Sequence, residues 1–153
     1  MTLQVGDVVP PFVASQDTGE LYTAAPGRWR VFYFFPKTTT THCQLQARRY
    51  QALYPEFEAM GIDIVGINGD PRKEQVEFRN LCKLSYPLID DSSQNLTQLF
   101  GVMDEPWPGE DIRRPRRETF LVNPLGVIVQ YWTEVNPGLD AETVLKASRE
   151  WRA

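Results

Sequence analysis

Cysteine and histidine are both scarce in this chain of 153 residues, which has two cysteines and a single histidine, His42. Two thiols are too few to staple a small secreted fold with disulfides, so each is expected to be inert, catalytic or metal-binding. One histidine leaves little room for a histidine-rich metal site, or for a Ser-His-Asp hydrolase that is not built on His42. The chemistry is therefore expected to depend on other groups.

Long apolar runs and an excess of positive charge are also missing. The sequence has no run of about 18 apolar residues and no basic-then-apolar segment before a small-residue cleavage site. Secretion and a membrane span therefore lack support, and we expect the protein in the cytoplasm. The formal net charge of −4 argues against a general nucleic-acid-binding protein. Four arginines do cluster at residues 113–117, and the simplest interpretation of them is a solvated loop.

What is present is a series of apolar and amphipathic segments that predict strands and helices. Residues 31–35 are continuously apolar, which is typical of a strand buried on both faces, and Pro36 ends it. Cys43 begins a set of apolar residues at three- and four-residue steps, which predicts a helix. The expected strands are residues 31–35, 62–67, 87–89, 119–122 and 127–132, and the expected helices are about residues 43–60, 70–84, 96–100 and 140–151.

Two strand–helix units followed by a hairpin and a final helix are the layout of a thioredoxin-like sandwich. The expected fold class is therefore α/β, with a central mixed β-sheet flanked by helices. No internal repeat or Gly/Ser linker divides the sequence, so residues 1–153 are expected to form one domain. Asp70 is expected to cap the second helix, with Pro71 in its first turn. Residues 103–115 contain three prolines and one glycine, which predicts a long surface loop.

The informative segment runs from Pro36 to Cys43, where the first strand gives way to the first helix. Cys43 falls in the first helical turn, where unpaired N–H groups and the positive end of the helix dipole favour a thiolate over a thiol. Thr40 comes three residues earlier, so its hydroxyl can face the same pocket and both accept and donate hydrogen bonds. Pro36 would shield that pocket without adding a competing N–H. These residues predict a nucleophilic cysteine.

The pattern Pro-x-x-x-Thr-x-x-Cys resembles the active-site motif of the peroxiredoxins. The residues around it resemble the bacterioferritin comigratory protein, or peroxiredoxin Q, subfamily, and the likeness extends over nearly the whole chain. A four-position motif alone is weak evidence, but here it stands at the correct strand-to-helix junction. The flanking segments that carry the resemblance are residues 5–7, 11–12, 34–37, 66–67, 70–71, 86–88, 100–102 and 117–121, followed by Gly126.

The resemblance assigns four roles: peroxidatic cysteine, peroxide-binding threonine, shielding proline and active-site arginine, which map to Cys43, Thr40, Pro36 and Arg117. A guanidinium stays charged and presents several donors, so Arg117 would stabilise the thiolate and hold the peroxide oxygens. The implied reaction is reduction of hydrogen peroxide and organic hydroperoxides through a Cys43 sulfenic acid, with no metal or other cofactor. The implied partners are thioredoxin or another thiol reductant, with no nucleic acid or membrane, and the chain is expected to be a monomer.

The second cysteine departs from the commonest family pattern, which has a resolving cysteine five residues after the peroxidatic one. That position is Arg48 here, and the other thiol is Cys82 on the expected second helix. Some members of the subfamily carry their resolving cysteine in the corresponding helix, so Cys82 is a candidate. A disulfide with Cys43 would need local unwinding, because the two Cα atoms must approach within about 7 Å. Reduction by an external thiol, pairing between two molecules and a purely core role for Cys82 remain open.

Other functions also fit a chain of this fold class. A thiol–disulfide oxidoreductase or redox relay usually has Cys-x-x-Cys at this junction, but Thr40 occupies the first of those positions. A non-catalytic binding module is disfavoured because the four active-site residues are intact. A metal site of His42, Cys43 and Cys82 is a weaker idea, since adjacent ligands on one chain rarely fit tetrahedral geometry without further donors.

Overall fold

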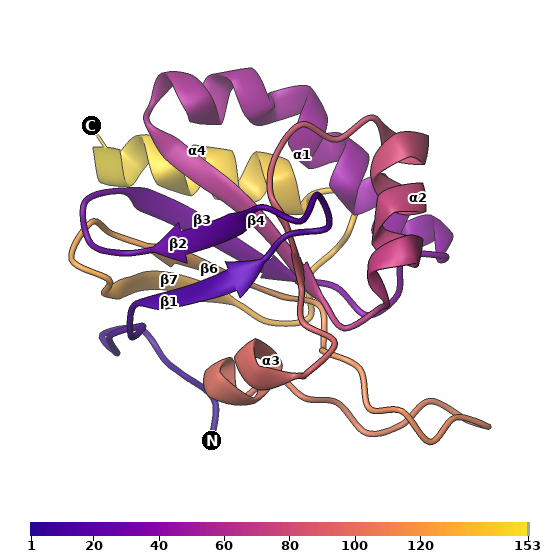
Figure 1. Cartoon of the computed structure of the whole chain (residues 1–153). Helices are drawn as coiled ribbons and strands as arrows, with labels where there is room; N and C mark the ends of the chain where they lie inside the picture. Colours follow the sequence, from indigo (N-terminus) through magenta and orange to yellow (C-terminus); the bar gives the residue numbers. More distant parts are fainter. Residues whose placement is uncertain (153) are drawn as a thin grey trace.

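The apolar runs of the sequence form a central β-sheet, and helices cover it (Figure 1). The computed structural model describes residues 1–152. The elements in chain order are β1 (Phe12–Ser15), β2 (Leu21–Ala24), β3 (Trp29–Phe34), α1 (Thr41–Ala59), β4 (Ile62–Asn68), α2 (Arg72–Cys82), β5 (Leu88–Asp90), α3 (Asn95–Phe100), β6 (Glu118–Val122), β7 (Ile128–Trp132) and α4 (Asp140–Arg152). Within residues 1–152, no helix is both long enough and apolar enough to cross a membrane.

The sheet has five strands in the order β5-β4-β3-β6-β7, so β3 lies at its centre. β3 pairs in parallel with β4 and antiparallel with β6, which makes the sheet mixed. The expected thioredoxin-like α/β sandwich with a central mixed sheet is therefore confirmed. β1 and β2 form a separate antiparallel hairpin that the sequence did not predict.

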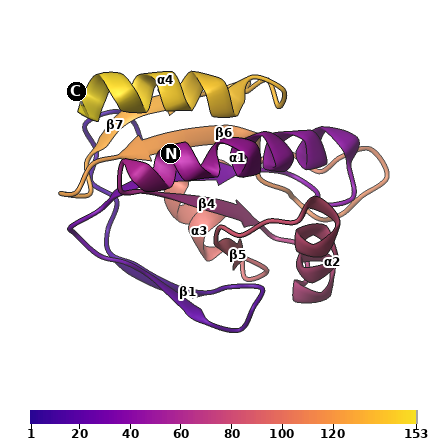
Figure 2. The same cartoon turned by 90° about the horizontal axis from the view of Figure 1, so that it is seen from above.

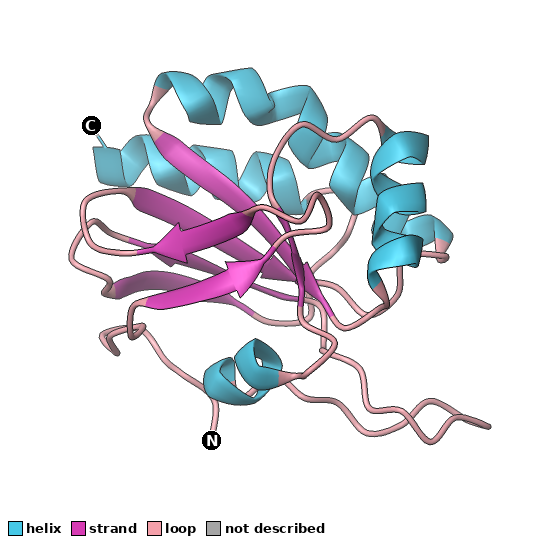
Figure 3. Ribbon diagram, in the orientation of Figure 1, coloured by secondary structure: helices cyan, strands magenta, loops and turns pink. Residues whose placement is uncertain are grey.

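Alternate side chains of β3 enter two different apolar cores, as the period-two geometry of a strand requires. Val31 and Tyr33, together with Phe35 just after the strand, pack into a core that also takes side chains from α1, α2 and α4. Phe32 and Phe34 pack into the opposite core with residues of α3 and the β1–β2 hairpin. Figure 2 shows α1 and α4 running side by side, and Figure 3 shows the sheet between the helical layers. Both faces of the central strand are thus covered.

The second helix differs from the expectation at both ends. Its N-cap is Pro71, and the Asp70 side chain makes no cap hydrogen bond, because that carboxylate has partners elsewhere in the fold. The helix ends at Cys82 rather than near residue 84, because Lys83 adopts the left-handed conformation with φ 56°. Cys82 is therefore the last residue of α2 and not part of its interior.

Candidate active site

The turn between β3 and α1 places Cys43 in the first turn of α1, with its side chain fully buried. Thr40 is the N-cap residue of this helix, and its Oγ1 accepts a hydrogen bond from the backbone N–H of Cys43 at 3.4 Å. The same hydroxyl donates to the carbonyl of Lys37 at 3.0 Å. A threonine cap satisfies one of the free N–H groups at a helix start. Thr40 therefore fixes the backbone that presents Cys43.

Arg117 reaches Cys43 from the residue immediately before β6. Its Nη2 donates to Cys43 Sγ at 3.3 Å, and its Nη1 donates to Gln46 Oε1 at 2.7 Å. Gln46 is buried and lies one helical turn after Cys43 on α1. The guanidinium is therefore held against two residues of the same helix face. The Cys43 sulfur therefore accepts a hydrogen bond from a cationic side chain, an environment in which reactive cysteines are found.

A buried carboxylate, that of Asp140, is hydrogen-bonded to Gln46. Asp140 begins α4, and its Oδ2 accepts hydrogen bonds from three side chains: Gln46 Nε2 at 3.1 Å, the Tyr50 hydroxyl at 2.5 Å and Thr119 Oγ1 at 2.9 Å. Burial raises the pKa of Asp140, while these hydrogen bonds and the charge of Arg117 oppose the rise. The carboxylate thus joins α1, β6 and α4 next to the site.

A second buried carboxylate anchors the loop that precedes Cys43. Asp70 Oδ2 accepts from both the backbone N–H and the hydroxyl of Thr38 at 2.8 Å, and its Oδ1 lies 3.0 Å from Arg114 Nη1. The same nitrogen of Arg114 donates to the carbonyl of Pro36 at 3.3 Å. The interpretation of the arginine cluster as a solvated loop is therefore wrong for Arg114, whose side chain is 11% exposed. Thr38 is buried as well.

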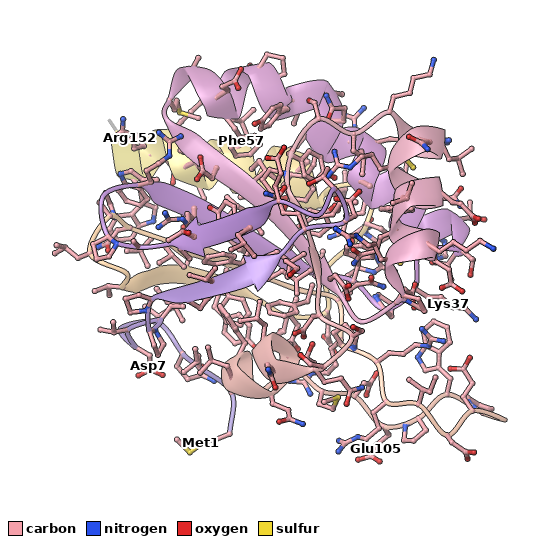
Figure 4. The ribbon with its side chains drawn as sticks, in the orientation of Figure 1. Met1, Asp7, Lys37, Phe57, Glu105 and Arg152 are labelled. Atoms are coloured by element: carbon pink, nitrogen blue, oxygen red, sulfur yellow. The ribbon has the colours of Figure 1, made fainter. Side chains whose placement is uncertain are left out.

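The long loop at residues 103–115 packs around the Asp70–Arg114 ion pair. Glu110 lies 2.9 Å from Arg114 Nε and 3.6 Å from Lys37 Nζ. Both cations also face the ring of Trp107, with Arg114 at 5.3 Å and Lys37 at 6.0 Å from its centroid. In Figure 4 the labelled Lys37 lies near this extended loop. The loop therefore braces the segment that leads into α1.

Cys82 lies on the neighbouring helix α2 and belongs to the same apolar core as Cys43. Both cysteines are free thiols, and Cys82 is 5% exposed. Burial raises the pKa of the Cys82 thiol, and the charge of Arg48 and its hydrogen bond partly oppose this. Arg48 Nη2 also lies 3.5 Å from the carbonyl of Leu81, so it reaches the end of α2 from α1. The sequence-predicted pair is therefore present on two adjacent helices in the reduced form.

The other candidates from the sequence lie around the same junction. Pro36 is half-buried directly after β3 and contacts Arg114 through its carbonyl, while His42 is exposed. Across residues 1–152, no group of three or more His, Cys, Asp and Glu side chains is arranged to hold a metal ion, so a site of His42, Cys43 and Cys82 gains no support.

Four residues of the site were missed by sequence reasoning: Gln46, Asp140, Asp70 and Arg114. Gln46 could have been found, because a residue three positions after a nucleophile shares its helix face. The other three residues reach the site only through tertiary packing, and nothing in the sequence around them indicates that they lie there.

The chain is similar to known proteins over most of its length. The model of the AhpC/TSA family matches residues 5–131. Peroxiredoxin Bcp of Xanthomonas campestris pv. campestris is 33% identical over 138 residues, which cover 90% of this chain and 86% of that protein.

Two solved structures share the fold at high similarity. The first is the Xanthomonas campestris bacterioferritin comigratory protein, studied for alkyl peroxide reduction in trapped intermediate and ligand complexes. It matches with a TM-score of 0.85 and 30% identity, covering 93% of this chain and 92% of that one. Peroxidoxin BcpB of Mycobacterium tuberculosis matches with a TM-score of 0.87 and 25% identity, covering 99% of both chains.

Proposed function

Because the chain belongs to the AhpC/TSA family and is a peroxiredoxin of the Bcp, or peroxiredoxin Q, type, we propose that Cys43 is the nucleophile of its thiol-dependent peroxidase activity. The observation that carries this proposal is the 3.3 Å contact between Arg117 Nη2 and Cys43 Sγ in the first turn of α1. A cation in contact with a helix-terminal sulfur provides what a nucleophilic thiolate needs.

In the first step, the Cys43 thiolate attacks the nearer oxygen of the hydroperoxide. A sulfur–oxygen bond forms as the O–O bond breaks, and the bonding electrons pass to the distal oxygen. That oxygen takes up a proton and leaves as water or an alcohol. The sulfur is oxidised to a sulfenic acid, the first step of the cysteine oxidation ladder.

The surrounding groups fit this step. Arg117 presents donors both to the sulfur and to the oxygen on which charge develops. The Thr40 hydroxyl accepts from the Cys43 N–H and donates to the Lys37 carbonyl. Because a hydroxyl rotates freely, it can redirect its proton to a peroxide oxygen without moving the backbone. Pro36 would keep water from the pocket. Since Cys43 is 0% exposed, substrate entry requires a small opening of the surrounding side chains.

In the second step, the Cys82 thiolate attacks the sulfenic sulfur of Cys43: the disulfide bond forms as the sulfur–oxygen bond breaks, and the oxygen takes up a proton and leaves as water. Both thiols lie at helix ends, Cys43 in the first turn of α1 and Cys82 at the end of α2. Helix ends open at lower cost than helix centres, so the required unwinding stays local. Thioredoxin or another thiol would then reduce the disulfide, which places the cycle in a reducing compartment such as the cytoplasm.

The test is to oxidise the reduced protein with one equivalent of hydrogen peroxide and to measure intact and peptide masses without reductant. Wild type is expected to lose two hydrogens and to yield a Cys43–Cys82 cross-linked peptide in the monomer. The Cys82→Ser variant is expected to gain one oxygen at Cys43, and Cys43→Ser is expected to leave peroxide unconsumed.

Two outcomes would change the proposal. A stable sulfenic acid in the wild type, with Cys82 still a free thiol, would establish a one-cysteine cycle and remove Cys82 from the mechanism. If Cys43 did not react, or if Cys43→Ser kept wild-type turnover, the assignment of the nucleophile would be wrong.

A further inference from the structure

The carboxylate of Asp140 does not contact Cys43, yet it is connected to the sulfur through two intervening side chains. Asp140 Oδ2 accepts from Gln46 Nε2 at 3.1 Å, and Gln46 Oε1 accepts from Arg117 Nη1 at 2.7 Å. Arg117 Nη2 then donates to Cys43 Sγ at 3.3 Å. The three bonds form one continuous chain from α4 to the reactive sulfur.

The orientation of the Gln46 amide determines whether these three hydrogen bonds can form together. A glutamine amide has a donor end and an acceptor end, and an arginine has donors alone. Gln46 can therefore hold Arg117 only with its oxygen, which requires a different acceptor for its nitrogen. Asp140 is that acceptor, and the amide is 0% exposed, so water does not readily replace it.

Two hydroxyls fix the position of the same carboxylate oxygen. Tyr50 lies one turn after Gln46 on α1 and donates at 2.5 Å, and Thr119 lies on β6 two residues after Arg117 and donates at 2.9 Å. A single oxygen therefore holds the helix that carries the thiol against the strand that carries the arginine. Such buried networks are rigid when every member is paired.

We propose that Asp140 is a positioning residue for Arg117: it accepts the Gln46 amide nitrogen, turns the amide oxygen toward the guanidinium and so keeps Nη2 on Cys43. This role rests on the proposed function of Cys43 and adds to it a residue that touches neither the sulfur nor the peroxide. Removing the carboxylate leaves the Gln46 nitrogen without its acceptor, and the amide is then free to rotate away from Arg117.

The experiment is a double-mutant cycle between Asp140→Ala and Gln46→Leu, made in the Cys82→Ser protein so that one thiol is present. Two rate constants are measured at pH 7: alkylation of Cys43 by iodoacetamide, which needs no peroxidase activity, and oxidation by hydrogen peroxide. Asp140→Ala is expected to lower both about tenfold, the size of one lost charge-assisted hydrogen bond. In the Gln46→Leu background the same change is expected to have no further effect, because the link is already broken.

Two control variants separate positioning from general damage. Asp140→Asn keeps an oxygen acceptor in place and is expected to restore most of the rate. Glu118→Ala removes another buried carboxylate, which pairs with Arg116 and Tyr131 instead of with Gln46, and it is expected to leave both rates near wild type. Urea unfolding of each variant verifies that the protein is folded at the assay temperature.

Additive effects of the two changes in the cycle would overturn the inference, as would equal losses in Asp140→Ala and Glu118→Ala. The two proposals fail in different ways. If Cys43 is not the peroxidatic residue, peroxide oxidation fails in every variant while the alkylation cycle still reports the coupling. If positioning by Asp140 is wrong, wild type reduces peroxide normally and the coupling is absent.

Discussion

Arg117 Nη2 lies 3.3 Å from Cys43 Sγ although the two residues are 74 positions apart in the chain. A hydrogen bond to a charged group contributes about 1.5–3 kcal/mol. Arg117→Ala is therefore expected to slow Cys43 oxidation by roughly 10- to 150-fold, as followed by stopped-flow mixing with hydrogen peroxide. Arg117→Lys should recover part of the rate, because it keeps the charge but cannot serve Cys43 and Gln46 together.

Arg116→Ala is the matched control for this prediction. Arg116 is the next residue in sequence, but its guanidinium pairs with Glu118 at 2.8 Å and with the carbonyl of Met103. Its loss leaves the buried Glu118 without its cation and is expected to cost stability, but the oxidation rate should stay near wild type because Arg116 contacts neither Cys43 nor Gln46. Equal losses in the two variants would mean that the whole loop, and not the Arg117 contact, supports reactivity.

The pair of Asp70 and Arg114 leads to a prediction about stability. Their side chains are 6% and 11% exposed, and removing one partner of a buried ion pair costs about 3–5 kcal/mol. Arg114→Ala is expected to lower the free energy of unfolding by about this amount in urea titrations. Arg113→Ala is the comparison, because its side chain is 49% exposed, and a change below about 1 kcal/mol is expected there. Similar values for both would show that the buried pair contributes little.

The centre of the sheet could be predicted from sequence because its strands are short segments of mostly apolar residues. Residues 31–35 are apolar on both faces, and residues 62–67 are too apart from Asp63, which local patterning reveals. The β1–β2 hairpin was missed because its strands have four residues each and expose alternate side chains. Its connecting turn is held by an ion pair between Asp17 and Arg79 at 2.6 Å, and a partner 62 residues away leaves no local signature.

The candidate site also contains residues that the local sequence predicts and residues that it does not. Cys43 and Thr40 follow from local rules, because a helix start needs a cap and favours a thiolate. Arg117 was found through its resemblance to a family motif. Asp140 looked like an ordinary helix-start residue, and its partner Gln46 is 94 positions away. Asp70 also fitted the rule for a helix cap, but a buried arginine and two donors from Thr38 determine its position instead.

Burial of Asp140 predicts a pH-dependent contribution to stability. Burial raises the pKa of this carboxyl in the folded protein, whereas in the unfolded chain it is about 3.9. The folded state therefore holds the proton at pH values where the unfolded chain has released it. The contribution is fully present below about pH 3.9 and is lost as the pH rises through the folded pKa.

Asp140→Asn removes this titration and isolates it. The unfolding free energy of wild type, minus that of the variant, is expected to fall as the pH rises from about 4 and then to level off. Urea unfolding at a series of pH values measures the difference, in which the titrations of all other groups largely cancel. A difference that stays constant with pH, or rises, would show that Asp140 keeps the same proton affinity in both states or is charged more readily when folded.

The resolving step is expected to depend on pH through the Cys82 thiol. Burial raises the pKa of the Cys82 thiol, and Arg48 opposes the rise through its charge and hydrogen bond. Attack on the Cys43 sulfenic acid requires the Cys82 thiolate, so disulfide formation is expected to accelerate with pH to values above about 8.5, the range of an ordinary thiol. It should also depend on Arg48, which reaches the end of α2 at Leu81.

Arg48→Ala is therefore expected to slow disulfide formation several-fold at pH 7 and to move its pH profile upward, while the oxidation of Cys43 stays at its wild-type rate. Stopped-flow fluorescence after one equivalent of hydrogen peroxide separates the two phases, and quenched samples analysed by mass assign the second to the Cys43–Cys82 disulfide. Arg49→Ala is the control, because Arg49 pairs with Glu142 of α4. If both variants shifted the second phase equally, the effect would come from the net charge of α1. If neither did, Arg48 would not assist Cys82.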